Sequence, residues 1–481
     1  MTYEDYTYFH REDFRKKLAA YEEMTAHGTP VWLEAYELTD IADYYSIQGQ
    51  KEKAQACIDY ALRIHPGSTD PLLYIARKHL FNKEWEKAEK IINSIADRKE
   101  DEIILLQAEL YLRQGLPKKA AKVLTIHYRR CTDDKDLLAY DCAQLYLDYD
   151  QVREARHWCD LALKENSQTD KFRLMNADIL VLENQAPEAI KVLNGLLDDD
   201  PYYTEAWESL GEAYFATGDF GKAIESADFA LAINEQSPHA IILKANTLYR
   251  LDDLEGAHQW YSKAISLDAT EPSSFFFDAV TLVTLGRNDE AYQLLEQAEQ
   301  LAQDDPANLE QVYLHMSDLL SNMGRPEEAL AYLDKADSIY HEVESYLRRA
   351  HVYLQNHMTE PGMSYLNSYK QLCEDSCQAS YEAGILLASV AMYTQARTEF
   401  AYVLKHATSP VLLGKSMAMV PYCHLMENNF NDFIETLHTV CEQDATYLKD
   451  ALGDFFPEEV SPKEYYRYAV DHADQYGQPP A

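Results

Sequence analysis

The sequence is poor in glycine and in basic residues, and each shortage disfavours a class of function. Its 481 residues include 16 glycines, less than half the share expected from an average usage of about 7%, and no Gly-x-Gly occurs. Nucleotide-binding loops need glycines to bring the backbone close to phosphates, so a nucleotide site is disfavoured. The 43 Lys and Arg are outnumbered by 81 Asp and Glu, which gives a formal charge of −38. Because cations hold nucleic acids and anionic lipids, we expect neither nucleic acid nor membrane as a partner.

Long apolar runs and clustered cysteines are also missing. No stretch approaches the roughly 18 uncharged apolar residues of a membrane-spanning helix, and the acidic, aromatic start of the chain differs from a signal peptide. The eight cysteines are scattered along the chain, which is typical of a reducing compartment rather than of a disulfide scaffold. We therefore expect a cytoplasmic protein.

Motifs for catalysis, cofactors and metals are equally scarce. The Gly-Lys-Ser triplet at 414–416 is similar to the end of a phosphate-binding loop, but Ser409 stands where that loop requires its first glycine. Cys373 and Cys377 lie four residues apart, and no second pair follows at the spacing of a structural zinc site. We expect no catalytic residues, no cofactor and no metal.

What the sequence does contain is a pair of small residues that returns about every 34 residues. The first members are Ala42, Ala76, Ala108, Ala143, Ala177, Gly211, Ala245, Ala279, Ser317, Ala350 and Gly384. The second members follow twelve residues later, at Ala54, Ala88, Ala120, Ala155, Ala189, Ala223, Ala257, Ala291, Ala329, Gly362 and Ala396. A fixed long period indicates a solenoid of stacked helical units.

Within one period the apolar residues recur at spacings of three and four, as they do on one face of a helix. Residues 204–237 illustrate this with Trp207, Leu210, Gly211, Tyr214 and Phe215 in a first helix and Ala223, Ala227, Ala230 and Leu231 in a second. Gly218 is expected to end the first helix in a left-handed conformation. We expect Gly211 and Ala223 to lie near the crossing of the two helices, where a larger side chain would push the axes apart.

This spacing resembles the tetratricopeptide repeat, and the consensus proline of that family corresponds to Pro66 and Pro201. The chain resembles bacterial cytosolic members of this family and contains about twelve such repeats. It implies an all-α fold, a right-handed α-α superhelix of helix pairs with terminal capping helices. The repeats are expected to start at residues 35, 69, 101, 136, 170, 204, 238, 272, 310, 343, 377 and 414. The last repeat departs from the pattern, with Pro421 and Phe433 at its two small positions.

The turn inside each repeat carries a second signal. Residues that tolerate a positive φ recur at one repeat position, at Gly49, Gly115, Asn184, Gly218, Gly286, Gly324 and Asn428. We therefore expect the two helices of each repeat to meet at a left-handed residue.

The chain divides into three predicted parts. Residues 1–34 form a capping segment whose helix spans 11–27, residues 35–447 form the repeat solenoid, and residues 448–481 form a C-terminal capping helix and tail. The last helix is expected from about 462 to 475, with Ser461 and Glu464 as a capping box around Pro462.

In the tetratricopeptide repeat family, the first helix of each repeat lines a concave face that binds peptides or partner helices. The resemblance implies that the ninth residue of each repeat lies on this face, and these residues are Asp43, Arg77, Glu109, Gln144, Asp178, Glu212, Asn246, Val280, Asp318 and His351. Five of these ten are acidic, and the nearby position 12 supplies apolar residues such as Phe215 and Tyr249. The lysines by which some members clamp the acidic end of a chaperone are missing at the fifth positions, so that mode is not expected.

These observations predict a non-enzymatic scaffold or adaptor. Its acidic groove would attract a basic or amphipathic segment of a protein partner, with Asp178, Glu212 and Asn246 at the centre. The alternative is a regulatory sensor that binds a short peptide or a small ligand. An enzyme is disfavoured because no segment outside the repeats is long enough for a catalytic domain.

Overall fold

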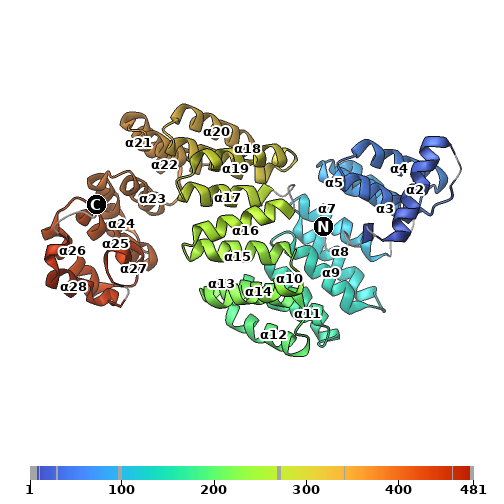
Figure 1. Cartoon of the computed structure of the whole chain (residues 1–481), viewed down its shortest axis with the longest axis horizontal. Helices are drawn as coiled ribbons and strands as arrows, with labels where there is room; N and C mark the ends of the chain where they lie inside the picture. The colour runs from blue at the N-terminus through green and yellow to red at the C-terminus, as the bar shows by residue number, and fades with distance from the viewer. Residues whose placement is uncertain are drawn as a thin grey trace. The chain divides into compact units, whose positions relative to one another are not determined.

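The computed structural model describes residues 8–9, 11–28, 31–95, 100–267, 272–340, 342–457 and 459–476, apart from the side chains of Asp304 and Asp474. These residues form helices joined by short turns, with no strand among them (Figure 1). The all-α prediction is confirmed. The solenoid boundaries at residues 34 and 447, and the capping role of the two end segments, stay predictions.

After α2 (Glu12–His27), the described residues form twelve consecutive helix pairs. In the N-terminal half these are α3 (Ala35–Ile47) with α4 (Lys51–Ile64), α5 (Thr69–Phe81) with α6 (Trp85–Ser94), α7 (Asp101–Arg113) with α8 (Pro117–Arg130), α9 (Lys135–Leu147) with α10 (Val152–Glu165), α11 (Asp170–Leu182) with α12 (Ala186–Asp199), and α13 (Thr204–Thr217) with α14 (Phe220–Ile233). In the C-terminal half they are α15 (Pro238–Arg250) with α16 (Leu254–Leu267), α17 (Pro272–Thr284) with α18 (Asn288–Leu301), α19 (Pro306–Asn322) with α20 (Pro326–Ile339), α21 (Glu344–Gln355) with α22 (Thr359–Leu372), α23 (Ser376–Ser389) with α24 (Tyr393–His406), and α25 (Pro410–Met426) with α26 (Phe430–Gln443).

The chain forms two compact units, Met1–Glu235 and Gln236–Ala481. We call them the N-terminal unit and the C-terminal unit. In both units, first helices of neighbouring pairs contact each other, as α3 contacts α5 and α19 contacts α21. We call the face that these first helices share the inner face of each unit.

The small residues of the repeat lie where the helices of a pair cross. Ala177 and Ala189, for example, are completely buried. A Cβ added to Gly362 would lie 2.6 Å from the Leu354 side chain, and a Cβ added to Gly384 would lie 2.6 Å from the Phe400 ring. Since real Cβ atoms do not approach so closely, the crossing has no room there for alanine.

The turn inside every pair places one residue at positive φ. The seven predicted residues all do so, with Gly49 at 70° and Asn184 at 60°. The other five turns were not predicted, because their residues are Lys83, Asp150, Asp252, His357 and Ala391, at φ of 55° to 62°. The tight turn therefore imposes the conformation whichever residue occupies the position.

The two largest insertions in the repeat pattern, before the ninth and the twelfth repeats, lengthen the first helix of those repeats at its N-terminal end. A turn of 3-10 helix (Ala302–Asp304) precedes α19, and both α19 and α25 begin four residues before the expected repeat start. Asp305 and Ser409 cap these two longer helices through their side chains. The last pair is helical in spite of its irregular sequence, with Pro421 inside α25 and Phe433 fully buried in α26.

The N-terminal helix forms as predicted and ends at Gly28, whose φ is 72°. The prediction for the C-terminal helix is wrong in detail. Ser461 makes no side-chain capping bond, and residues 462–476 divide into a 3-10 turn, α28 (Tyr465–Asp471) and α29 (Ala473–Tyr476). The Phe456 and Tyr465 rings stack at 3.9 Å, so aromatic packing rather than a regular helix organises this end.

Candidate functional site

The inner face of the N-terminal unit carries the first six predicted site positions, on α3, α5, α7, α9, α11 and α13. All six side chains interact with other residues of the chain, as three of them illustrate. Arg77 binds Glu102 of α7 at 2.7 Å, Glu109 accepts from Arg113 at 2.9 Å, and Gln144 donates to Asp148 at 3.0 Å. Among these three only Glu109 is acidic, so its ion pair with Arg113 neutralises the predicted acidic row at α7.

Asp178 and Glu212 form the part of the row where acidic charges oppose each other. Asp178 lies half-buried on α11, and Glu212 lies exposed on α13, a first helix that contacts α11. The pKa of Asp178 is raised to about 6, chiefly by burial; a hydrogen bond from Ser209 lowers the pKa, and the negative charge of Glu212 raises it. A cation placed between these carboxylates would relieve both the desolvation and the repulsion.

Two further acids of this face were missed because only the ninth positions were considered. Asp40 and Asp141 occupy the sixth position of their repeats, and burial is the main cause that raises the pKa of each. Tyr8 donates to Asp40 at 2.5 Å, and the Lys171 ammonium lies near enough to Asp141 to oppose its shift. Reading the sixth position together with the ninth would have found them.

The predicted groove residues Phe215, Asn246 and Tyr249 contact other residues of the chain, so they are less available to a partner than the sequence predicted. The Phe215 ring packs 5.5 Å from Phe220 across the turn of its own pair. Asn246, in the C-terminal unit, accepts a hydrogen bond from Tyr261 at 2.5 Å, and Tyr249 packs against Ala245, Ala257 and Tyr261. Asp43 is exposed on α3.

The inner face of the C-terminal unit has a different character. His315 and Asp318 on α19 lie close to Arg348 and His351 on α21, with 4.0 Å between Arg348 and Asp318. Burial lowers the pKa of both histidines and raises that of Asp318. In the part of the chain that the structure describes, no group of three or more His, Cys, Asp or Glu is arranged to hold a metal.

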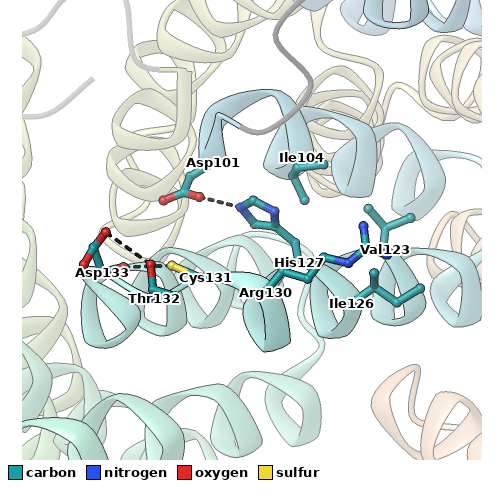
Figure 2. Close-up of a pocket in the computed structure, with 9 residues that line it drawn as sticks. All are labelled: Asp101, Ile104, Val123, Ile126, His127, Arg130, Cys131, Thr132 and Asp133. Carbon is teal, nitrogen blue, oxygen red and sulfur yellow. Dashed lines mark hydrogen bonds and ion pairs between the residues drawn. The ribbon is translucent and has the colours of Figure 1, made fainter.

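A pocket of about 690 Å³ lies between α7, α8 and the turn that follows α8 (Figure 2). His127 of α8 and Asp101 of α7 are joined at 2.5 Å inside it. Ile104, Val123 and Ile126 supply apolar walls. Burial raises the pKa of the Cys131 thiol in the same pocket, so the thiol is held in its protonated, unreactive form.

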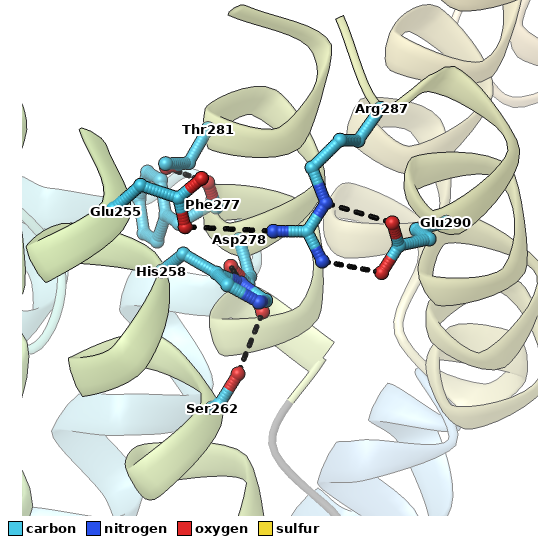
Figure 3. A network of polar contacts seen from close by, with 8 residues as sticks. All are labelled: Glu255, His258, Ser262, Phe277, Asp278, Thr281, Arg287 and Glu290. Atoms are coloured by element: carbon cyan, nitrogen blue, oxygen red, sulfur yellow. Dashed lines mark hydrogen bonds and ion pairs between the residues drawn. The ribbon is translucent and has the colours of Figure 1, made fainter. Parts of the chain in front are cut away.

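A polar network on α16, α17 and α18 is structural (Figure 3). Asp278, only 1% exposed, binds His258 at 2.6 Å and accepts weakly from Ser262 at 3.4 Å. Burial raises the pKa of Asp278, and His258 opposes that shift. Nearby, Arg287 bridges Glu290 at 2.5 Å and Glu255 at 3.6 Å. The network links residues of these three helices to one another.

Comparison with known proteins identifies the repeats. Models of the tetratricopeptide repeat match residues 174–241 and 310–340. The helix pairs, the buried small residues and these matches together define the class: the chain contains tetratricopeptide repeats.

Two curated relatives and one solved structure illustrate how far the similarity extends. The TPR repeat-containing protein YpiA of Bacillus subtilis (strain 168) is 22% identical over 55% of this chain and 71% of its own. The Hsp70-Hsp90 organising protein of Plasmodium falciparum is 26% identical over 26% of this chain and 48% of its own. Among solved structures, that of the APC/C hetero-tetramer Cut9-Hcn1 covers 79% of this chain and 76% of the matched chain, with 14% identity and a TM-score of 0.41.

The described helices also include none that is both long and apolar enough to cross a membrane. Tetratricopeptide repeats generally mediate protein–protein interaction and are typically non-enzymatic.

Proposed function

We propose that this protein is a non-enzymatic scaffold whose N-terminal unit binds a basic, amphipathic segment of a partner protein. The segment lies on the inner face, with its cations at Asp178 and Glu212. The observation that carries the proposal is that the neighbouring helices α11 and α13 place the half-buried Asp178 close to the exposed Glu212, and burial is the main cause that raises the pKa of Asp178 to about 6. A lysine or arginine of the partner stabilises the ionised form of both groups.

The remaining features agree with such a role. The formal charge of −38 attracts a basic ligand and speeds its encounter at low salt. Asp40 and Asp141 extend the acidic surface along α3 and α9. All eight cysteines are free thiols, which supports the cytoplasmic placement that we include in the proposal. We include no nucleic acid among the partners.

The test is the affinity of the full chain for a fluorescent amphipathic peptide with lysines on one helical face and leucines on the other. The Asp178→Asn/Glu212→Gln variant removes the two opposed charges. We expect its affinity to fall about tenfold at low ionic strength, since close charge pairs contribute on the order of 1 kcal/mol or more.

The matched control is Asp198→Asn/Glu225→Gln. Both residues are exposed acids of the same unit on second helices, α12 and α14, so this variant changes the net charge equally. We expect its affinity to stay within about twofold of the original. Equal losses in the two variants would show that the peptide senses only the overall negative charge, and the proposal would be wrong.

A further inference from the structure

Helix α8 is a basic helix in an acidic protein. Its fourteen residues contain no Asp or Glu, in a chain whose formal charge is −38. Its five Lys and Arg residues, all exposed, are Lys118, Lys119, Lys122, Arg129 and Arg130. Lys119 lies 5.5 Å from the Tyr111 ring, and the other four form no ion pair with any residue that the structure describes. Their charge is therefore available to a partner.

These cations surround one exposed apolar side chain. Ile126 is 40% exposed, and Lys122 and Arg130 stand four residues before and after it. At 3.6 residues per turn, residues three and four apart lie on one helical face. Arg129, three residues after Ile126, belongs to the same face. The exposed face of α8 thus combines positive charge with an apolar centre.

The pocket between α7 and α8 opens beside this face. Ile126 and Arg130 line the pocket as well as belonging to the exposed face of α8. Figure 2 shows the Arg130 side chain lying along α8 beside Val123 and Ile126. The volume of about 690 Å³ falls in the range of about 300–1,000 Å³ that is typical of ligand pockets, so the pocket has room for apolar side chains of a partner.

We propose that the exposed face of α8 and this pocket form a second docking surface, for an acidic segment of a protein. Carboxylates of the segment pair with Lys118, Lys122 and Arg129, and an apolar side chain enters the pocket between Val123 and Ile126. This surface lies on a second helix, so it is separate from the inner face proposed for a basic partner.

The chemistry of the surface favours an acidic protein segment over a nucleic acid. The cations cover one helix of about 21 Å, and Ile104, Val123 and Ile126 give the pocket beside them apolar walls. Apolar walls form no hydrogen bonds or ion pairs with a phosphate backbone, whereas they can bind the apolar side chain of an amphipathic segment.

The test uses the full chain and a fluorescent peptide of glutamates with a single central leucine, read by anisotropy. The variant Lys118→Glu/Lys122→Glu reverses two charges of the surface while keeping good helix formers. The matched control, Lys405→Glu/Lys449→Glu, reverses two exposed lysines of the C-terminal unit. A peptide with serine in place of leucine and a single-stranded oligothymidine complete the set.

We expect the α8 variant to lose about tenfold or more in affinity while the control stays within about twofold. The serine peptide should bind several-fold more weakly than the leucine peptide. Ile126→Ser, which leaves every charge in place, should remove that difference between the peptides. Equal losses in both charge variants, equal affinity for both peptides, or tighter binding of the oligothymidine would each overturn the proposal.

Discussion

The two units place acids in contrasting surroundings. In the N-terminal unit Asp178 is half-buried beside another acid, Glu212, and its pKa is raised to about 6. In the C-terminal unit Asp318 lies among His315, His351 and Arg348, and Asp278 is buried against His258. The C-terminal unit thus places basic side chains beside its buried acids, whereas Asp178 faces a second carboxylate. Two acids that lie close together without a basic neighbour therefore indicate a binding face for a cation better than the number of acids on a face does.

The largest expected effect comes from breaking the buried pair of the C-terminal unit. His258→Ala leaves the Asp278 carboxylate, 1% exposed, without its partner, and we expect a loss of about 3 kcal/mol in the free energy of unfolding in urea. His258→Leu/Asp278→Leu should recover most of that loss, because it removes the buried charge as well. A loss below about 1 kcal/mol in the single variant would show that the pair contributes little.

The helix crossings provide the next comparison. Gly384→Ala brings a methyl group to 2.6 Å from the Phe400 ring, and overpacking of this kind costs about 1–3 kcal/mol. Gly384→Ala/Phe400→Leu should restore part of the thermal stability. Ala177→Gly, at the equivalent position in the N-terminal unit, should cost about 1 kcal/mol through helix propensity alone. A neutral Gly384→Ala would contradict the crowded crossing.

Acid titration should separate the two inner faces. Because the pKa of Asp178 is higher in the folded chain than when unfolded, its ionised form destabilises the fold. That destabilisation is absent below the unfolded pKa of about 3.8 and complete above about 6. We expect Asp178→Asn to raise the free energy of unfolding by about 1–2 kcal/mol at neutral pH. The gain should vanish near pH 4, and a gain that stays constant across this range would show that ionisation of Asp178 is not its cause.

The histidines of the C-terminal unit should respond in the opposite direction. Burial lowers the pKa of His315 and His351, so the folded chain resists their protonation. Their effect on stability is absent above the unfolded pKa of about 6.5 and becomes destabilising as the pH falls below it. When the pH is lowered from 7 to 5, the melting temperature of the His315→Gln/His351→Gln variant should fall less than that of the original chain.

The smallest expected effect lies in the turns. Ala391 holds a φ of 60°, which favours glycine over alanine. Ala391→Gly should raise the free energy of unfolding by about 0.5–1 kcal/mol, and the reverse change Gly115→Ala in the N-terminal unit should lower it by a similar amount or more. Chemical unfolding of both variants measures the difference.

The sequence predicted most of the fold because each repeat is specified locally. Small residues such as Ala177 and Ala189 set the crossings, and ten of the twelve first helices begin within one residue of the predicted start. The errors occur where tertiary packing overrides the local sequence pattern. At the C-terminal end the Phe456 and Tyr465 rings stack on each other, and the expected capping box at Ser461 does not form.

The site was harder to predict because charge depends on partners in other repeats. Arg77 pairs with Glu102 of the next repeat, which the ninth-position pattern does not reveal, whereas the Glu109–Arg113 pair joins residues four apart on α7 and could have been predicted from the sequence. The opposition of Asp178 and Glu212 becomes visible only when α11 and α13 are brought side by side.

The most direct test of the proposed binding face is to map where a basic peptide touches the full chain. An amphipathic lysine–leucine peptide that carries one photoreactive benzophenone is cross-linked to the protein, and the modified residues are identified by mass spectrometry. We expect cross-links on α11 and α13, around Asp178 and Glu212. Cross-links on second helices or on the inner face of the C-terminal unit, with α11 and α13 unmodified, would contradict the proposed binding face.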